Sequence, residues 1–124
     1  MELDIIEIRA YNYFELNRKV KQINEKDLAN ISTLLPQLKP IEITVSGLAR
    51  LNFASVYESE RRMFQKFYRN VYFNFHRVKN DKLLLVINNE IRLPHVIYIH
   101  QLQNLYYDLV GDVLKLPSTG ITNL

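Results

Sequence analysis

The chain has 124 residues, of which 48% are hydrophobic and 23% are charged, so it has the size and composition of one globular domain. It contains no cysteine and three glycines, which excludes disulfide frameworks, cysteine-ligated metals and glycine-rich phosphate loops. No apolar run reaches the roughly 18 residues that cross a bilayer, and the first residues carry acids where a signal peptide has basic residues. These features predict a soluble, cytoplasmic protein. The net charge of +3 permits contact with nucleic acid without requiring it.

Apolar residues in the first third of the chain recur at intervals of three and four, which is helical spacing. Residues 3–23 follow this pattern and predict a first helix. Asn24 resembles the cap of a second, shorter helix over residues 28–35, which Pro36 stops. Residues 41–45 alternate between apolar and polar types, so they predict either a short strand or an extended linker.

Residues 53–79 contain neither glycine nor proline, and their spacing predicts a long helix. On a helical wheel the apolar positions fill an arc of about 180°, whereas an arc of about 100° is enough for a helix that lies on its own core. The excess predicts that this helix packs against two neighbours, one of which can be another chain. The candidate subunit-interface residues are Phe53, Tyr57, Phe64, Phe67, Tyr68, Val71, Tyr72 and Phe75.

The opposite side of this predicted helix is cationic, since residues 61–79 include six basic residues and no acidic one. One interpretation is a stripe that binds phosphates and stacks one aromatic ring on a base. The other is a solvated or partner-facing surface. The candidate residues for contact with nucleic acid or a partner are Arg62, Lys66, Arg69, Phe73 and Arg77.

The sequence pattern of the last thirty residues differs from that of the preceding chain, and the change comes after Pro94. Residues 95–100 alternate like a strand, Gly111-Asp112 predicts a turn, and residues 113–116 predict a second short strand. So small a unit cannot bury a core of its own, and we expect it to be incomplete at its C-terminus. The predicted fold is therefore mainly α, a helical bundle domain with a small C-terminal β domain. The predicted division is a helical assembly domain at 1–87, a linker at 88–94 and a β domain at 95–124.

The sequence contains no recognisable combination of side chains for catalysis or metal binding. His76, His95 and His100 are the only histidines, and the last two would point to opposite faces of the predicted strand. Acidic residues are scattered singly, and no serine has a plausible neighbouring histidine. The sequence predicts a protein that is not an enzyme and that uses no metal or cofactor.

The string VGDVLKLP at residues 110–117, followed by Ile121 and Leu124, resembles the small β domain of GINS subunits. In that domain a Gly-Asp turn, a short apolar strand and a Leu-Pro step lead into a short helix. Residues 60–79 are similar to the long helix of the GINS helical domain, and the order of the two domains is similar to that of the archaeal subunit with the helical domain first. The matching β-domain residues are Gly111, Asp112, Val113, Leu116 and Pro117.

The resemblance implies a non-catalytic scaffold for DNA replication. GINS is a heterotetramer that joins the MCM helicase to a RecJ-like or Cdc-type partner by protein contacts, without a nucleotide or metal. The expected partners are therefore other GINS subunits, the MCM helicase and a RecJ-like protein, in a nucleoid-associated location and with weak non-specific DNA binding at most. The alternative from the residues alone is a small basic winged-helix DNA-binding protein of archaeal or viral origin.

Overall fold

The computed structural model describes residues 7–58 and 61–117, and these residues form mainly β-structure. Seven strands build two antiparallel sheets, accompanied by four α-helices. The prediction of a mainly α fold is therefore wrong. The strands are β1 (Tyr13–Leu16), β2 (Lys19–Gln22), β3 (Ala54–Glu58), β4 (Arg61–Tyr68), β5 (Val71–Arg77), β6 (Leu83–Ile87) and β7 (Ile91–Leu93). The α-helices are α1 (Glu25–Ala29), α2 (Ile31–Leu34), α3 (Val45–Arg50) and α4 (Ile99–Val110), with 3-10 turns η2 (Leu35–Gln37) and η3 (Lys79–Asp81).

The larger sheet is a five-stranded meander in which β3 to β7 pair in chain order. Successive side chains of a strand point to opposite faces of the sheet, so the register assigns each residue to a face. Phe64 pairs with Phe75, and Phe75 pairs with Leu85 across the next ladder. These three side chains are buried on the face that packs against the helices.

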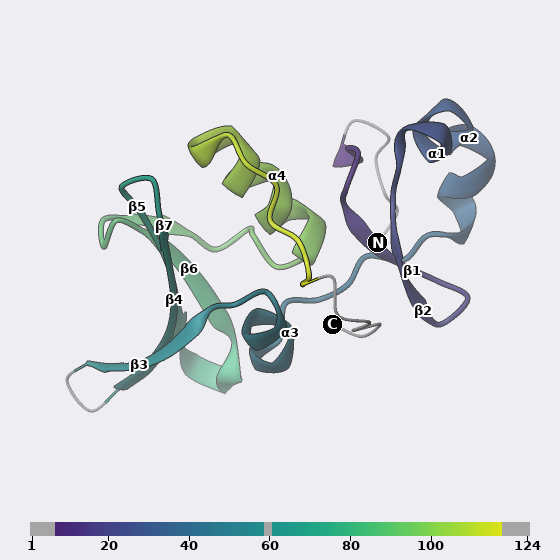
Figure 1. The fold of residues 1–124 in the computed structure, drawn as a ribbon. Helices are drawn as coiled ribbons and strands as arrows, with labels where there is room; N and C mark the ends of the chain where they lie inside the picture. Colours follow the sequence, from purple (N-terminus) through teal and green to yellow (C-terminus); the bar gives the residue numbers. More distant parts are fainter. Residues whose placement is uncertain (1–6, 59–60, 118–124) are drawn as a thin grey trace.

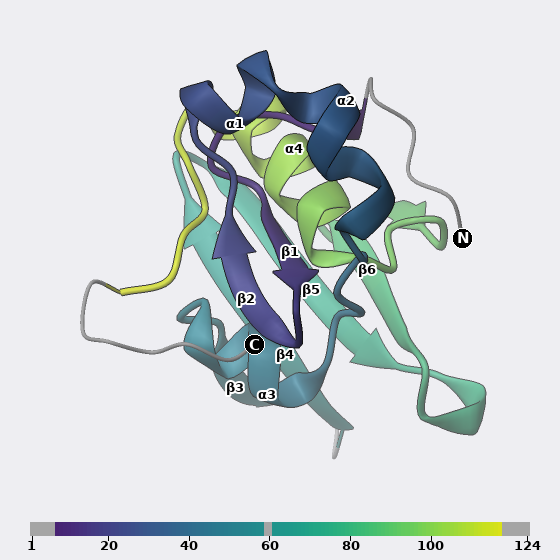
Figure 2. The same cartoon turned by 90° about the vertical axis from the view of Figure 1, so that its right-hand side faces the viewer.

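The main core lies between this packed face and α4. Figures 1 and 2 show α4 running along the sheet, with α3 near the lower end of the same face. Ile99, Leu102 and Tyr106 of α4 are buried in one cluster with the aromatic residues of β4 and β5. None of the described helices is long and apolar enough to cross a membrane.

The β1–β2 hairpin covers the other side of α4 and forms a third layer (Figure 1). Tyr13 points into the main core, whereas its neighbour Phe14 points into a second cluster with Ile23 and Ile31. Hydrogen bonds tie the layers together, because the Gln103 Oε1 atom of α4 accepts from the Tyr13 backbone N–H at 2.8 Å. Strand β1 thus buries an aromatic residue on each of its two faces.

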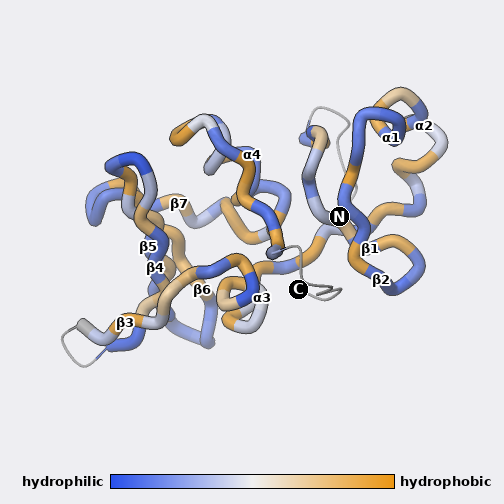
Figure 3. The backbone as a smooth tube through the Cα atoms, in the orientation of Figure 1, coloured by the Kyte–Doolittle hydropathy of each residue, from blue (hydrophilic) through white to orange (hydrophobic). Residues whose placement is uncertain are grey.

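Asparagine makes the tight turns of this glycine-poor chain. Asn88 and Asn89 have positive φ in the three-residue connection between β6 and β7, whereas Asn17 and Asn70 have positive φ in two-residue connections between antiparallel strands. Such turns need left-handed backbone at both central positions, which asparagine tolerates better than other non-glycine residues. The hydrophilic colour of the strand connections in Figure 3 marks these positions.

Four predicted elements are wrong, and one of them is the strand at residues 113–116, which pair with no described strand. Residues 53–79 form β3, β4, β5 and their connections, in place of a long helix, and residues 59–60 lie outside the described part. The described part of 3–23 contains the β1–β2 hairpin, in place of a helix. Residues 95–100 form a turn and the start of α4, in place of a strand.

Three local predictions are confirmed. The side chain of Asn24 accepts a hydrogen bond from the Asp27 backbone and caps α1. The dipeptide Asn88-Asn89 follows the apolar run at residues 83–87 and is a turn signal in the sequence, and it lies in the turn that ends β6. Residues 41–44 form the extended linker of the two alternatives, and they contact residues 97–99 through one isolated bridge.

Candidate functional site

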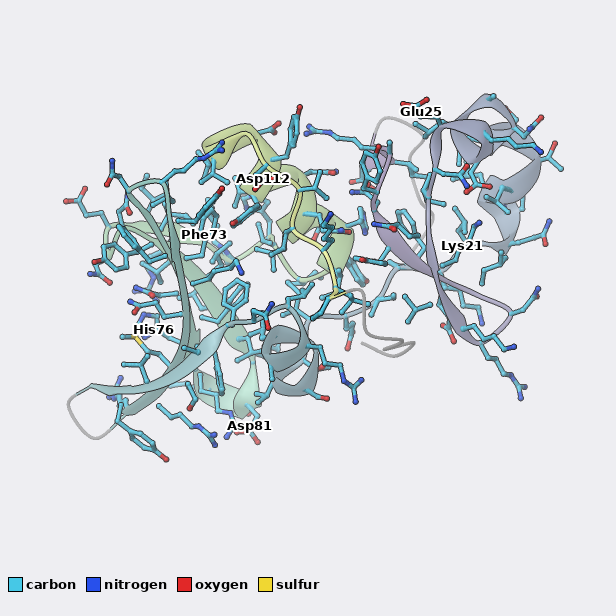
Figure 4. All side chains as sticks on the ribbon, viewed as in Figure 1. Lys21, Glu25, Phe73, His76, Asp81 and Asp112 are labelled. Atoms are coloured by element: carbon cyan, nitrogen blue, oxygen red, sulfur yellow. The ribbon has the colours of Figure 1, made fainter. Side chains whose placement is uncertain are left out.

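The five-stranded sheet has one face that no described element covers, and we call it the open face. Its members alternate with the packed residues along each strand, as the pairing register requires. In Figure 1 all four α-helices lie on the other side of the sheet, and Figure 4 shows Phe73 directed toward α4 while His76 lies on the side away from it. The open face comprises Ala54, Val56, Met63, Gln65, Phe67, Tyr72, Asn74, His76, Leu84, Val86 and Arg92.

The open face is unusually apolar for a surface that faces solvent, because such faces usually carry polar side chains. Met63 and Leu84 are buried, yet neither belongs to either core cluster. A sheet surface with this composition is typical of a binding surface.

Two aromatic rings stand together near one end of the open face. Phe67 and Tyr72 are directly paired across β4 and β5, with ring centroids 4.2 Å apart. Their side chains remain 51% and 40% exposed. The pair stabilises the hairpin, and it also presents adjacent aromatic surfaces to solvent.

Hydrogen-bonding groups lie beside the aromatic pair. The fully buried Asn74 follows Tyr72 on the same face, and its amide donates to the Asn89 side chain at 2.8 Å. The Oδ1 atom of Asn74 has no hydrogen-bond partner among the described residues. Gln65 is directly opposite Asn74 on β4, so two amides occupy the centre of the face.

Positive charge is concentrated on the sheet. Residues 54–93 contain eight Lys and Arg residues and four Asp and Glu residues, whereas the rest of the chain is nearly balanced. In the described part of the chain, all three ion pairs lie outside this sheet: Arg9 with Asp108, Lys21 with Asp27, and His100 with Glu7. Arg92, on β7, places one exposed cation on the open face itself.

The structure divides the predicted subunit-interface residues between the two faces. Phe53, Phe64 and Phe75 are buried in the core, and Tyr68 and Val71 pack against it. Phe67 and Tyr72 form the exposed pair, and Tyr57 is 71% exposed on the opposite face beyond the helices. The expected single apolar stripe is therefore wrong, and only two of its members share the open face.

The predicted cationic stripe is likewise divided. Phe73 is 0% exposed and packs on Tyr106, so its expected role as a stacking residue on the cationic side is wrong. Arg69 donates to the Val110 carbonyl oxygen at 2.6 Å, and Lys66 donates to the Leu51 carbonyl oxygen at 3.3 Å. The remaining two, Arg62 and Arg77, are exposed at the far end of the sheet.

The predicted β-domain motif follows a helix. Gly111 ends α4 with a left-handed backbone at φ 70°, and the Asp112 carboxylate accepts from the Val113 backbone N–H at 2.9 Å. Residues 113–117 are extended but form no ladder, with Leu116 buried and Pro117 half-buried. Ser118 to Leu124, including Ile121, lie outside the described residues.

The histidines are far from forming a common site. His100 is fully buried in α4, whereas His95 is exposed in the preceding turn. Burial lowers the pKa of His100, and the nearby Glu7 carboxylate opposes this shift from 3.8 Å. Over residues 7–58 and 61–117, no three His, Asp or Glu side chains gather as metal ligands.

Comparison of the chain with protein-family descriptions, curated proteins and solved structures finds no match. The GINS resemblance therefore remains a prediction. In the described residues, the segment likened to the long helix of the GINS helical domain forms strands β4 and β5, and the expected β domain contains α4.

Proposed function

We propose that this chain is a non-catalytic protein that binds single-stranded nucleic acid on its open face. The observation that carries the proposal is the exposed Phe67–Tyr72 pair on an uncovered, net-positive sheet. Unpaired bases stack on aromatic side chains of this kind, and each stacked base is worth roughly 1 to 3 kcal/mol. The exposed parts of the two rings form one continuous aromatic surface on which an unpaired base can stack.

The composition around the pair also favours nucleic acid. Gln65 and His76 carry groups that donate or accept hydrogen bonds with base edges, and they lie on the same face as the rings. The eight basic residues of segment 54–93 supply a field that attracts phosphates. An acidic partner protein would use the same charge, but it has no need of two adjacent exposed aromatic rings.

The shape of the site favours single strands over duplexes. Five strands spaced about 4.8 Å apart span about 19 Å, whereas the major groove of B-DNA is about 12 Å wide. The open face is thus too broad to enter the groove. The longest described helix, α4, buries Leu102 and Tyr106 in the core and carries Asp108 on its exposed side. It is poorly suited to the groove-reading role that a winged-helix protein requires.

The GINS-type scaffold role is not the function that the described geometry supports best. It requires a helical assembly surface, and the apolar residues assigned to that surface are mostly in the core. A protein-binding role on the open face remains the competing outcome of the experiment below.

Fluorescence anisotropy with labelled 15-nucleotide DNA and RNA strands tests the proposal. We expect the wild-type protein to bind single strands more tightly than the matching duplex. Phe67→Ala should weaken binding to single strands by roughly 5- to 160-fold, as the loss of one stacked base predicts. The matched control is Tyr57→Ala, which removes a more exposed aromatic ring from the opposite face.

Three results would refute the proposal. The first is no binding of any single strand by the folded wild-type protein near 50 mM salt. The second is an equal loss of affinity in Tyr57→Ala and Phe67→Ala. The third is concentration-dependent self-association that Phe67→Ala abolishes in the absence of strand binding, which would make the open face a protein interface.

A further inference from the structure

A polar cavity lies at the edge of the sheet beside the aromatic pair. The pairing of β3 with β4 ends at Ala54 opposite Gln65, so residues 66–68 of β4 have no strand partner on that side among the described residues. A cavity of about 270 Å³ occupies this edge between β4, α4 and the segment after Gly111. The lining residues that matter here are Lys66, Phe67, Tyr68, Tyr106, Asp112 and Lys115.

Lys66 brings an uncompensated positive charge to the cavity. The side chain is half-buried, and no carboxylate of the described residues lies within ion-pair distance of it. The Nζ atom makes one hydrogen bond, to the Leu51 carbonyl oxygen, so the other two N–H donors of the ammonium remain for a ligand. Burial lowers the pKa of Lys66, which is the cost of holding this charge away from water.

Other polar side chains line the cavity, and those of Tyr106 and Lys115 can donate hydrogen bonds to a ligand. Burial, together with Asp112 and Tyr68, raises the pKa of Tyr106 to about 12, so its hydroxyl remains protonated at neutral pH. Lys115 is exposed at the rim and adds a second cation. The single acid, Asp112, already accepts a hydrogen bond from its neighbouring backbone N–H. Two cations and one anion leave the cavity with a net positive charge.

We propose that this cavity binds a phosphate group of the strand that stacks on Phe67 and Tyr72, with Lys66 and Lys115 as its principal ligands. The inference rests on the function proposed above. Successive side chains of β4 point to opposite faces, so Phe67 lies on the open face while Lys66 lies on the cavity side of the unpaired edge. Phe67 also lines the cavity at this edge, so the phosphate group of a nucleotide whose base stacks on the Phe67 ring can reach Lys66 around the edge.

The test measures the salt dependence of strand binding for wild type, Lys66→Met and Lys115→Gln, using strands with a 5′-phosphate and with a 5′-hydroxyl. Loss of one phosphate contact should lower the slope of log affinity against log salt by about 0.7. We expect this decrease in both variants and recovery in Lys66→Arg. If the decrease occurs with both strands, the group is a backbone phosphate. If it requires the 5′-phosphate, the group is terminal. Lys19→Gln, an exposed cation on the distant hairpin, serves as the control.

The two proposals fail in different ways. If Phe67→Ala weakens binding but Lys66→Met and Lys115→Gln leave the salt slope at the wild-type value, the cavity proposal is wrong and the open-face function stands. Because Lys66→Met also removes the hydrogen bond to Leu51, the residue after α3, Lys115→Gln must show the decrease by itself for the proposal to hold. If the folded wild-type protein binds neither strand, both proposals are refuted.

Discussion

Phe67 and Phe73 lie on neighbouring strands and differ in which face they occupy, so the same substitution at both positions measures the two faces separately. Phe73 is 0% exposed, and its ring centroid lies 4.9 Å from that of Tyr106. Phe73→Ala removes a fully buried ring and leaves a cavity, which costs about 3 to 5 kcal/mol. Because a domain of this size has about 5 to 15 kcal/mol of stability in total, we expect this variant to be severely destabilised.

Phe67→Ala should lower the free energy of unfolding much less than Phe73→Ala. The side chain already exposes half of its surface, so it loses about half of the roughly 2 kcal/mol that full burial of such a side chain provides. The expected cost is about 1 kcal/mol. Urea denaturation followed by circular dichroism gives both values. The slope of the unfolding free energy against urea concentration should remain equal to that of wild type. A loss at Phe67 as large as that at Phe73 would show that the open face is covered in solution and would refute our assignment of the faces.

Three further variants test individual contacts. Burial holds the pKa of His100 in the folded protein below 6.5, so as pH falls the unfolded chain takes up a proton on His100 before the folded protein does. We therefore expect the free energy of unfolding to decrease between pH 7 and pH 5. In urea denaturation, this decrease should be smaller for His100→Gln than for wild type. Gly111→Ala has room for its methyl group, since the nearest atom is the Arg69 Nη1 atom at 3.5 Å. The left-handed backbone φ of 70° should nevertheless make this variant about 1 kcal/mol less stable, and Gly111→Asn should lose less. Equal melting temperatures for wild type and Gly111→Ala would contradict this expectation. Thr44→Ala removes the hydroxyl that accepts from the Gly47 backbone N–H at 3.0 Å and should cost about 1 kcal/mol, whereas Thr44→Ser should retain the cap, as thermal unfolding will test.

Strands with apolar residues on both faces explain why the sequence predicted helices. In β1, Tyr13 and Phe14 are adjacent and both buried, because each faces a different core cluster. In β4, Met63 of the open face adjoins Phe64 of the packed face. Such neighbours erase the period-two alternation that identifies a strand, and the remaining pattern fits a wide helical arc. The open-face residues that we assign to binding are therefore the same ones that obscured the strands.

The turns were missed for a related reason. Arg69-Asn70 reverses the chain between β4 and β5 with positive φ at both positions, although it contains neither glycine nor proline. Asn17-Arg18 does the same between β1 and β2. The signal that was available is the asparagine itself, placed between two segments rich in β-branched and aromatic residues. Local features that involve only a few neighbouring residues, such as the Asn24 cap and the Asn88-Asn89 turn, were predicted correctly.

The candidate site could be predicted only in part. Phe67, Tyr72 and Lys66 were recognised as unusual from the sequence, because aromatic and basic residues are concentrated in this segment. Their assignment to particular surfaces depended on the secondary structure, so an error in the period moved Phe73 from the core to the cationic side. The cavity beside β4 depends on where the pairing with β3 ends and on Lys115, which is distant in sequence. No local pattern reports such a feature.

The hydrogen bonds around α4 have a consequence for how the protein is made. The meander pairs strands that are neighbours in the chain, so its hairpins can form one after another as they leave the ribosome. The Tyr13 hydroxyl, by contrast, accepts from the Leu116 backbone N–H, 103 positions later. Gln103 similarly donates to the carbonyl oxygens of both Tyr11 and Leu114. The N-terminal hairpin, although synthesised first, must therefore wait for almost the whole described chain before its last native contacts can form.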